Sequence, residues 1–393
     1  MRPYERTHPW ISFQLNLGEI PFEIWLLLGE ARSKAEHLAG VPLTPATATK
    51  LHKLYLAKGV HATTAIEGNT LSAEDVQRQI DGKLHVPPSK EYLRRETANI
   101  LAAVNDIFDA ACLGPTAPPT TVDFCEFNRR VLEGLSHERV EPGVVRKFPV
   151  VVANYKAPEH GDCTYLLGRL AQWLAELQAQ APPAMGMAMP ILRAILAHLY
   201  MAWIHPFGDG NGRTARLLEF SILVSAGMPT PAAHLLSNHY NETRSEYYRQ
   251  LARASEQRTV LGFVQYALRG FVDALRAQIA DVRQQTMSVV WVNYVHDQFR
   301  DLDSKTARRR KELVLALTRS GETLPRRVRE LSPKLAAEYA TKTQRTVDRD
   351  IAGLKTMGLI VEEDGKVRSR TEAVLAFLPR KATDAEGVTV QAE

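Results

Sequence analysis

A glycine-rich turn between two helical segments constrains this chain more than any other feature. Residues 205–216 read HPFGDGNGRTAR, and an apolar helical pattern over 190–204 precedes them. That helix has to end here, because the residue before Pro206 is pushed out of helical geometry. Three glycines within five positions allow the backbone to turn tightly and to approach a ligand. A second helix begins near Arg213, so we predict two helices joined by a tight loop.

The side chains of this loop suit a ligand that carries several phosphates. A helix N-terminus attracts anions, and a glycine-rich loop before it forms an anion-binding nest. Arg213 and Arg216 are three residues apart, so both guanidinium groups point to the same side of the first turn. Asp209 offers one hard oxygen ligand for a Mg²⁺ that bridges substrate phosphates. His205 is a candidate general base near neutral pH. Together these residues predict chemistry on a nucleoside triphosphate.

The same residues exclude several other site classes. A P-loop requires a glycine at the position that Phe207 occupies, and Lys where Arg213 follows Gly212. Asp209 and Asn211 supply too few acidic ligands for an EF-hand, and the chain has no H-E-x-x-H sequence.

The 3 cysteines form neither a C-x-x-C pair nor a zinc spacing. We therefore expect a reduced, cytoplasmic protein.

Most of the chain has the periodicity of amphipathic helices, interrupted by Gly- and Pro-rich loops. No stretch of about 18 apolar residues is free of charges, so we expect no transmembrane helix and no membrane partner. Residues 1–20 lack the apolar core of a signal peptide. Residues 143–155 are rich in valine and predict a short hairpin, either a packing element or a binding flap. The predicted helices are 22–38, 47–60, 90–111, 122–134, 165–179, 190–204, 213–227, 245–254 and 260–285.

The C-terminal part has its own pattern and most of the positive charge. The whole chain carries a net charge of +5, whereas residues 304–370 contain 17 Lys or Arg and 9 Asp or Glu, a net of +8. Three predicted helices (311–319, 333–340, 344–357) precede two short strands (359–362, 366–370) around an Asp-Gly turn, which is a winged-helix pattern. Winged helices bind either DNA or proteins. If DNA binds, the expected contacts are Arg345, Arg349, Lys366 and Arg368.

The motif from His205 to Arg216 resembles the signature HPFxDGNGRxxR of the Fic (Fic/Doc) family at all nine specified positions. The resemblance extends over most of residues 1–290 and implies a mostly α-helical fold. That fold comprises a helical core with a small β-hairpin flap, here 143–155, and the winged helix-turn-helix domain adds to it. The implied domains are a helical region at 1–110, a catalytic core at 111–290, a linker at 291–305, a winged helix at 306–380 and a flexible tail at 381–393.

The resemblance also implies an activity, namely transfer of AMP from ATP to a Ser, Thr or Tyr hydroxyl of a target protein. The chain itself is an expected target, and a homodimer is a further expectation. In this interpretation His205 deprotonates the hydroxyl, Asp209 holds Mg²⁺, and Asn211 with the loop amides binds the α-phosphate. Arg213 and Arg216 hold the outer phosphates. The implied nucleotide-binding residues are Gly208, Gly210, Asn211, Gly212, Arg213 and Arg216.

A second motif, TTAIEGN at 63–69, resembles the family's inhibitory helix, with Thr63 and Glu67 at its matching positions. The resemblance implies that Glu67 pairs with Arg216 and blocks the γ-phosphate position, because a carboxylate and a phosphate compete for one guanidinium. In some relatives the same glutamate assists removal of AMP, so that direction stays open. Two alternatives remain: a DNA-binding regulator with a nucleotide-sensing Fic domain, and a transferase that uses another donor such as UTP or CDP-choline.

Overall fold

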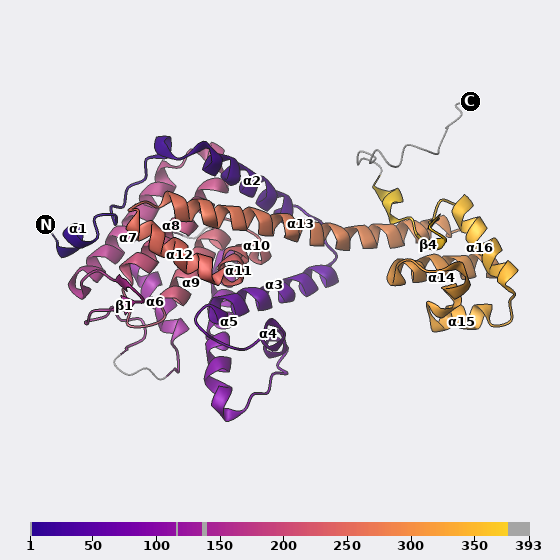
Figure 1. Cartoon of the computed structure of the whole chain (residues 1–393), viewed down its shortest axis with the longest axis horizontal. Helices are drawn as coiled ribbons and strands as arrows, with labels where there is room; N and C mark the ends of the chain where they lie inside the picture. Colours follow the sequence, from indigo (N-terminus) through magenta and orange to yellow (C-terminus); the bar gives the residue numbers. More distant parts are fainter. Residues whose placement is uncertain (1, 115–116, 136–139, 376–393) are drawn as a thin grey trace. The chain divides into compact units, whose positions relative to one another are not determined.

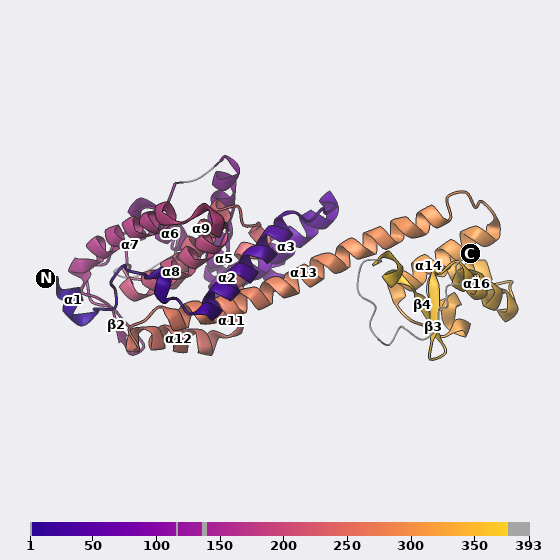
Figure 2. The same ribbon diagram turned by 90° about the horizontal axis from the view of Figure 1, so that it is seen from above.

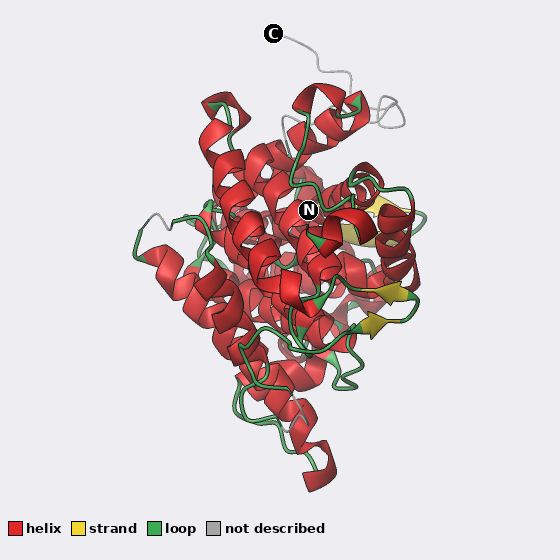
Figure 3. Ribbon diagram, turned by 90° about the vertical axis from the view of Figure 1, so that its left-hand side faces the viewer, coloured by secondary structure: helices red, strands yellow, loops and turns green. Residues whose placement is uncertain are grey.

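The computed structural model describes residues 2–114, 117–135 and 140–375, and it divides into two units, 1–280 and 281–393. The predicted tail 381–393 and the last residues of the predicted winged helix, 376–380, lie outside the described residues. Helices dominate both units, with only two small strand pairs among the described residues (Figure 3). The mostly helical fold class is confirmed. No described helix is long and apolar enough to span a bilayer.

The first unit is a set of helices around one central pair (Figure 1). In chain order these helices are α1 (Pro3–Thr7), α2 (Phe22–Ala39), α3 (Pro45–Ala65), α4 (Ala73–Ile80), α5 (Glu91–Cys112), α6 (Thr121–Val131), α7 (His160–Gln180), α8 (Ala188–Ile204), α9 (Asn211–Ser225), α10 (Thr230–Ala233), α11 (Leu235–Glu242), α12 (Arg244–Glu256) and α13 (Leu261–Gln298), the last of which continues into the second unit.

Capping side chains determine where several of these helices begin. Thr44 caps α3 by accepting a hydrogen bond from the Thr47 amide, and proline follows it at the first helical position. Ser72 opens α4 in a capping box with an acidic residue three positions later, and Thr120 opens α6 in the same way. The Pro-rich sequence before Thr120 cannot continue a helix, so α6 starts after it.

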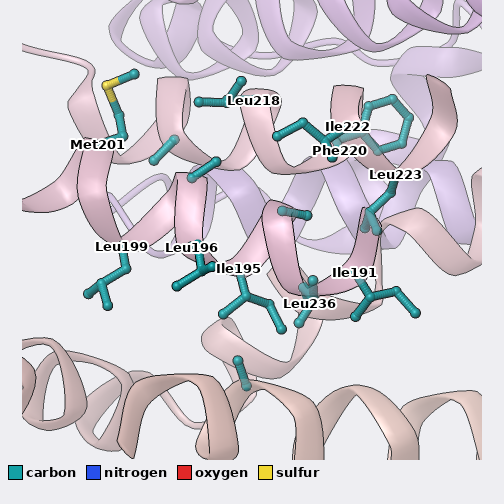
Figure 4. Close-up of a cluster of buried hydrophobic side chains, with 14 of the residues drawn as sticks. Ile191, Ile195, Leu196, Leu199, Met201, Leu218, Phe220, Ile222, Leu223 and Leu236 are labelled. Atoms are coloured by element: carbon teal, nitrogen blue, oxygen red, sulfur yellow. The ribbon is translucent and has the colours of Figure 1, made fainter. Parts of the chain in front are cut away.

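The central pair consists of α8 and α9, which pack against each other. Helices α2 and α7 also pack on α8, and α3, α5 and α6 pack on α9. Helix α8 is largely apolar, and nearly all of its residues are buried, as a helix enclosed by other helices requires. Burial of each large apolar side chain in this core contributes about 1.5–3 kcal/mol to the free energy of folding. The packed pair of helices in turn holds the loop between α8 and α9 in place. Figure 4 shows this core, with Ile191, Ile195, Leu196, Leu199, Met201, Leu218, Phe220, Ile222, Leu223 and Leu236 labelled.

The predicted hairpin at 143–155 is shorter than expected and lies later in the sequence. Strand β1 (Val151–Val152) pairs antiparallel with β2 (Tyr155–Lys156). Residues 143–150 instead run along the motif, where Val145 forms an isolated bridge with Phe207. The Val-rich composition indicated extended backbone, but the pairing partner is the motif loop as well as the next strand.

The second unit has three helices followed by a hairpin, in the predicted order. Its elements after α13 are α14 (Lys305–Ser320), α15 (Pro333–Tyr339), α16 (Gln344–Thr356), β3 (Ile360–Glu363) and β4 (Lys366–Ser369). Helix α14 packs on β4 and α16 on β3 (Figure 2). The hairpin turn is confirmed, because Asp364 and Gly365 both have positive φ, as a tight two-residue turn requires.

The predicted linker at 291–305 differs from the structure. Helix α13 continues to Gln298, so the first half of this segment is helical. Trp291, Val295 and Phe299 are buried in the core of the second unit, with the Trp291 indole donating a hydrogen bond of 2.8 Å to Thr318. Spacing of four residues places these side chains on one helix face, and their burial stabilises the helix where a linker was expected.

Candidate active site

The motif loop begins at a residue with unusual backbone geometry. His205 ends α8 in the left-handed conformation, with φ 48° and ψ 57°. A non-glycine residue in this region needs support from its surroundings. Here Arg146 provides it by donating hydrogen bonds to the His205 and Pro206 carbonyls. The imidazole is half-buried. Burial lowers the pKa of His205 to about 4, so its ring is neutral at pH 7.

Arg146 holds the flap segment against this turn. Its Nε donates to the carbonyl oxygen of His205 (2.8 Å), and its amide donates to that of Pro206 (3.0 Å). Its two other guanidinium nitrogens donate to backbone carbonyls of Phe148 (2.8 Å) and Pro158 (2.6 Å). Arg146 is buried, so these bonds fix the backbone at His205 from the outside. Sequence reasoning missed this residue, because nothing local distinguishes one arginine in a Val-rich segment.

Two asparagines brace the loop from within. The Asn211 side chain accepts a hydrogen bond from the Phe207 amide and donates one to the Phe207 carbonyl, each at 2.9 Å. Asn128 of α6 donates to the carbonyl of Asp209 (2.9 Å) and accepts from the amide of Gly143 (3.0 Å). Asn211 was predicted as a phosphate ligand, and in this structure, which holds no nucleotide, its side chain bonds the loop backbone. Asn128 was missed, because it reaches the loop from a distant helix.

Each of the three motif glycines lies where a side chain would clash or where the backbone has positive φ. A Cβ atom on Gly208 would lie 2.9 Å from a methyl of Val140, and Gly210 has φ 76° at the start of α9. A Cβ atom on Gly212 would lie 2.2 Å from the Glu67 Oε1 atom. Real Cβ atoms do not tolerate such distances, so glycine at 212 makes room for the Glu67 carboxylate.

Arg213 and Arg216 both lie in the first turns of α9 and both are buried. Arg213 donates from Nη1 to Oε1 of Glu96 on α5 (2.8 Å), and its Nη2 lies 3.5 Å from Oδ1 of Asp209. The Asp209 carboxylate also accepts a hydrogen bond from the Gly210 amide (2.6 Å). The predicted phosphate-binding and metal-binding residues therefore lie together at the N-terminus of α9.

Arg216 meets the second motif directly. Its Nη2 donates to Oε1 of Glu67 (2.5 Å) and to the backbone carbonyl of Thr63 (3.0 Å). The Arg216 side chain is 1% exposed and that of Glu67 is 32% exposed. Burial alone would lower the pKa of Arg216 and raise that of Glu67. Their mutual attraction outweighs burial, so the pKa of Arg216 is raised and that of Glu67 is lowered. Both groups are charged at neutral pH.

The Arg216 guanidinium still has capacity for another anion. Its Nε and Nη1 atoms are buried and have no hydrogen-bond partner among the described residues. A buried unsatisfied donor is costly, and a phosphate group is a chemically suitable partner for a guanidinium. Glu67 therefore occupies one of several donor positions on this side chain.

The segment that carries Glu67, residues 63–69, comprises the last residues of α3 and the turn after it. We call it the inhibitory segment after the motif that it resembles. Thr63 contacts Arg216 through its backbone carbonyl. The hydroxyl of Tyr248 on α12 donates to the carbonyl of Ile66 (3.2 Å). Two further tyrosines, Tyr240 and Tyr247, are buried. Tyr240 bonds Glu219 (2.9 Å) and Tyr247 bonds His198 (2.9 Å). These two are core residues.

Among the described residues no cluster of three acidic, histidine or cysteine side chains could hold a metal ion. Asp209 is the acidic residue in the motif loop, and its carboxylate is 43% exposed. One accessible carboxylate fits a Mg²⁺ that takes its remaining ligands from water and substrate phosphates. It does not fit a metal caged by protein alone.

Comparison with known proteins gives a consistent result for the middle of the chain. Residues 118–223 match the model of the Fic/DOC family. "Protein adenylyltransferase Fic" of Culex quinquefasciatus is 30% identical over 223 residues, which is 57% of this chain and 42% of that protein. "Protein adenylyltransferase fic-1" of Caenorhabditis briggsae is 30% identical over 234 residues, 59% of this chain and 43% of that protein. The chain thus spans less than half the length of these relatives.

Solved structures share the fold. A Fic family protein from Desulfovibrio desulfuricans superposes with a TM-score of 0.55 at 22% identity, covering 89% of this chain and 96% of that one. Fic-1 of C. elegans (residues 134–508) superposes with a TM-score of 0.52 at 24% identity, covering 66% of this chain and 73% of that one. At these identities the likeness concerns the fold alone.

Proposed function

This chain belongs to the Fic family, and on that premise we propose that it is a protein adenylyltransferase restrained by its own Glu67. One observation carries the proposal: at the glycine-rich loop that begins at His205, the Nη2 atom of Arg216 on α9 donates a hydrogen bond of 2.5 Å to Oε1 of Glu67. The substrates are ATP and a Ser, Thr or Tyr hydroxyl of a protein, including a hydroxyl of this chain.

In the proposed reaction the hydroxyl oxygen attacks the α-phosphorus of ATP. A bond forms between these two atoms, and the bond from the α-phosphorus to the oxygen that bridges to the β-phosphorus breaks. Pyrophosphate leaves, and the hydroxyl proton moves to the His205 imidazole. The lowered pKa keeps this ring neutral and able to accept a proton at pH 7. The bonds from Arg146 to the carbonyls of His205 and of Phe148 in the flap segment hold the histidine at its left-handed turn.

The phosphates are proposed to lie at the N-terminus of α9. There the amides of the loop and the helix dipole favour negative charge, and Arg213 and Arg216 supply two guanidinium groups for the outer phosphates. Asn211 keeps the loop open by bonding the Phe207 backbone. Asp209 would hold Mg²⁺, which when bound neutralises charge on the leaving phosphates.

Glu67 is proposed to inhibit by competition. Its carboxylate takes a donor of Arg216 that the γ-phosphate would otherwise use, and its Oε1 lies over the backbone of Gly212. ATP that binds with Glu67 in place lacks this contact, so its triphosphate is held in a less reactive arrangement. The Glu67 side chain is 32% exposed and therefore accessible to water, and we propose that it also orients a water for removal of AMP from the modified protein.

Labelled ATP tests the chemistry. We expect protein labelling from α-labelled ATP with Mg²⁺ in Glu67→Gly, and none in Glu67→Gly combined with His205→Ala. We expect no label from γ-labelled ATP in either variant. Protein labelling by the γ-phosphate would mean that the chain is a kinase. Equal labelling with and without His205 would exclude its role as the base, and parallel assays with UTP and CDP-choline test the donor.

We also propose that the second unit binds DNA through α16. Arg345 and Arg349 are exposed on this helix and form no ion pair among the described residues. The predicted wing contacts are already paired, Lys366 with Glu322 and Arg368 with Glu363 and Glu372. We expect a salt-sensitive mobility shift of a DNA fragment that Arg345→Ala with Arg349→Ala abolishes. No shift at low salt would exclude DNA binding.

A further inference from the structure

The inhibitory segment, which contacts Arg216 directly, also connects with the other arginine of the motif, Arg213, through Glu96. Glu96 of α5 accepts two hydrogen bonds. Arg213 donates to its Oε1 atom (2.8 Å), and the side-chain nitrogen Nδ2 of Asn69 donates to its Oε2 atom (2.9 Å). The Arg213 and Glu96 side chains are 5% and 17% exposed, so solvent screens this pair only weakly. Asn69 lies two residues after Glu67. One carboxylate therefore connects the inhibitory segment with the first arginine of α9.

The orientation of Asn69 is fixed by its other bonds. Its Nδ2 also donates to the Leu93 carbonyl (2.9 Å), and its Oδ1 accepts from the Leu71 amide (3.0 Å). Both polar ends of this buried amide are thus in use, so the side chain cannot turn without losing bonds. The nitrogen that faces Glu96 stays there as long as the inhibitory segment keeps its place.

The guanidinium of Arg213 lies between two carboxylates. Glu96 binds its Nη1, and Asp209 lies 3.5 Å from its Nη2. Glu96 is on α5, away from the motif loop, whereas Asp209 belongs to the loop and is the proposed metal ligand. A long side chain such as arginine pays entropy when a ligand orders it, and an existing partner removes that cost before the ligand arrives.

From this arrangement we propose that Glu96 is a positioning residue. It aims Arg213 at the outer phosphates of the nucleotide, and through Asn69 it ties this arginine to the inhibitory segment. The proposal rests on the proposed function, in which Arg213 binds those phosphates. Glu96 itself touches no phosphate, and its effect is carried by the direction of the Arg213 guanidinium.

Nucleotide binding separates this role from a merely structural one. In a Glu67→Gly background, which removes the carboxylate from Arg216, the added change Glu96→Gln should weaken Mg-ATP binding roughly tenfold, as expected for loss of one charge-assisted hydrogen bond. Binding of AMP, which lacks the outer phosphates, should not change. The measurement is isothermal titration calorimetry of both nucleotides. Equal loss of ATP and AMP affinity, or no loss of either, would overturn the proposal.

Helix α5 offers a matched control. Glu91 pairs with Arg94 at the surface, with a side chain that is 46% exposed. Glu91→Gln makes the same chemical change on the same helix, and it should leave both affinities unchanged. Glu96→Asp keeps the charge but shortens the side chain, so we expect an intermediate ATP affinity. If Glu96→Gln does not fold by circular dichroism, Glu96→Asp decides, and an unchanged ATP to AMP ratio in it contradicts the proposal.

The link to Asn69 is tested by a double-mutant cycle in the same background. Asn69→Ala should weaken ATP binding about two- to threefold, because Glu96 loses the bond that orients it. Combined with Glu96→Gln it should add nothing further. Independent effects that multiply would refute the link. These affinities are measured without any transfer, so absence of protein labelling in Glu67→Gly would refute the proposed function and leave this test intact.

Discussion

The ion pair between Glu67 and Arg216 should stabilise the first unit, and Glu67→Gln tests this. Glu67→Gln keeps the size of the side chain and removes its charge, which leaves Arg216 with one remaining bond, to the Thr63 carbonyl at 3.0 Å. The arginine is 1% exposed, so its charge cannot turn to solvent. Breaking one side of a buried pair costs several kcal/mol, but Glu67 is 32% exposed, and this screening reduces the expected cost to about 2 kcal/mol.

A loss of this size corresponds to a fall in Tm of roughly 4–8 °C for a unit of this length. Differential scanning calorimetry of the full chain would measure it as a shift of the first unit's transition, compared with Glu91→Gln as an exposed control. Mg-ATP should raise the Tm of Glu67→Gln more than that of the wild type, because a phosphate then meets the unpaired guanidinium.

An unchanged or higher Tm in Glu67→Gln would refute this reasoning. It would mean that the desolvation of the two charges offsets their attraction, so the contact is no net restraint. Equal stabilisation of both proteins by Mg-ATP would show that the carboxylate and the nucleotide do not compete.

Three other predictions follow from the same contacts. His205 has to be neutral to accept a proton, and its pKa is about 4. The rate of AMP transfer by Glu67→Gly should therefore stay constant from pH 8 to pH 6 and fall only as the pH approaches 4. A midpoint near pH 6.5 in the pH–rate profile would contradict this prediction. Gly212→Ala should lower the free energy of unfolding of the wild type, because its Cβ would lie 2.2 Å from the Glu67 carboxylate. In Glu67→Gly the remaining close neighbour is the end of the Arg216 side chain at 3.2 Å, which can shift, so the same change should raise the free energy of unfolding by up to about 1 kcal/mol through helix propensity. The same sign in both backgrounds would contradict the clash. In the second unit the buried Asp350 accepts hydrogen bonds from Arg309 and two other side chains. Asp350→Asn should therefore lower the free energy of unfolding of the second unit by roughly 3 kcal/mol and leave that of the first unit unchanged, as measured by calorimetry. A loss below about 1 kcal/mol in the second unit would contradict this prediction.

The local parts of the site could be predicted from sequence. The turn at Pro206, the glycines and the arginine spacing all follow from neighbours in the chain, and the structure has α8 and α9 joined by this loop. The contact between Glu67 and Arg216 could be predicted only through the family resemblance, since 149 residues separate the two. No periodicity or propensity indicates such a contact.

The residues that support the motif were out of reach for the same reason. Arg146, Asn128 and Glu96 come from three different segments, and each looks like an ordinary polar residue in its own sequence context. Their roles depend on packing between distant elements, which the sequence pattern does not encode. The helical start of the predicted linker was missed differently, because its apolar spacing was helical and the adjoining core was unknown.

The most direct test of the account compares the initial rates of protein labelling by the wild type and by Glu67→Gly at saturating α-labelled Mg-ATP. The account predicts a rate at least tenfold higher in Glu67→Gly, as expected when one guanidinium–phosphate contact of about 1.4 kcal/mol is restored. Adding Arg216→Ala should abolish this gain. Equal rates in the wild type and Glu67→Gly, or a gain that persists without Arg216, would contradict the claim that Glu67 restrains the site through Arg216.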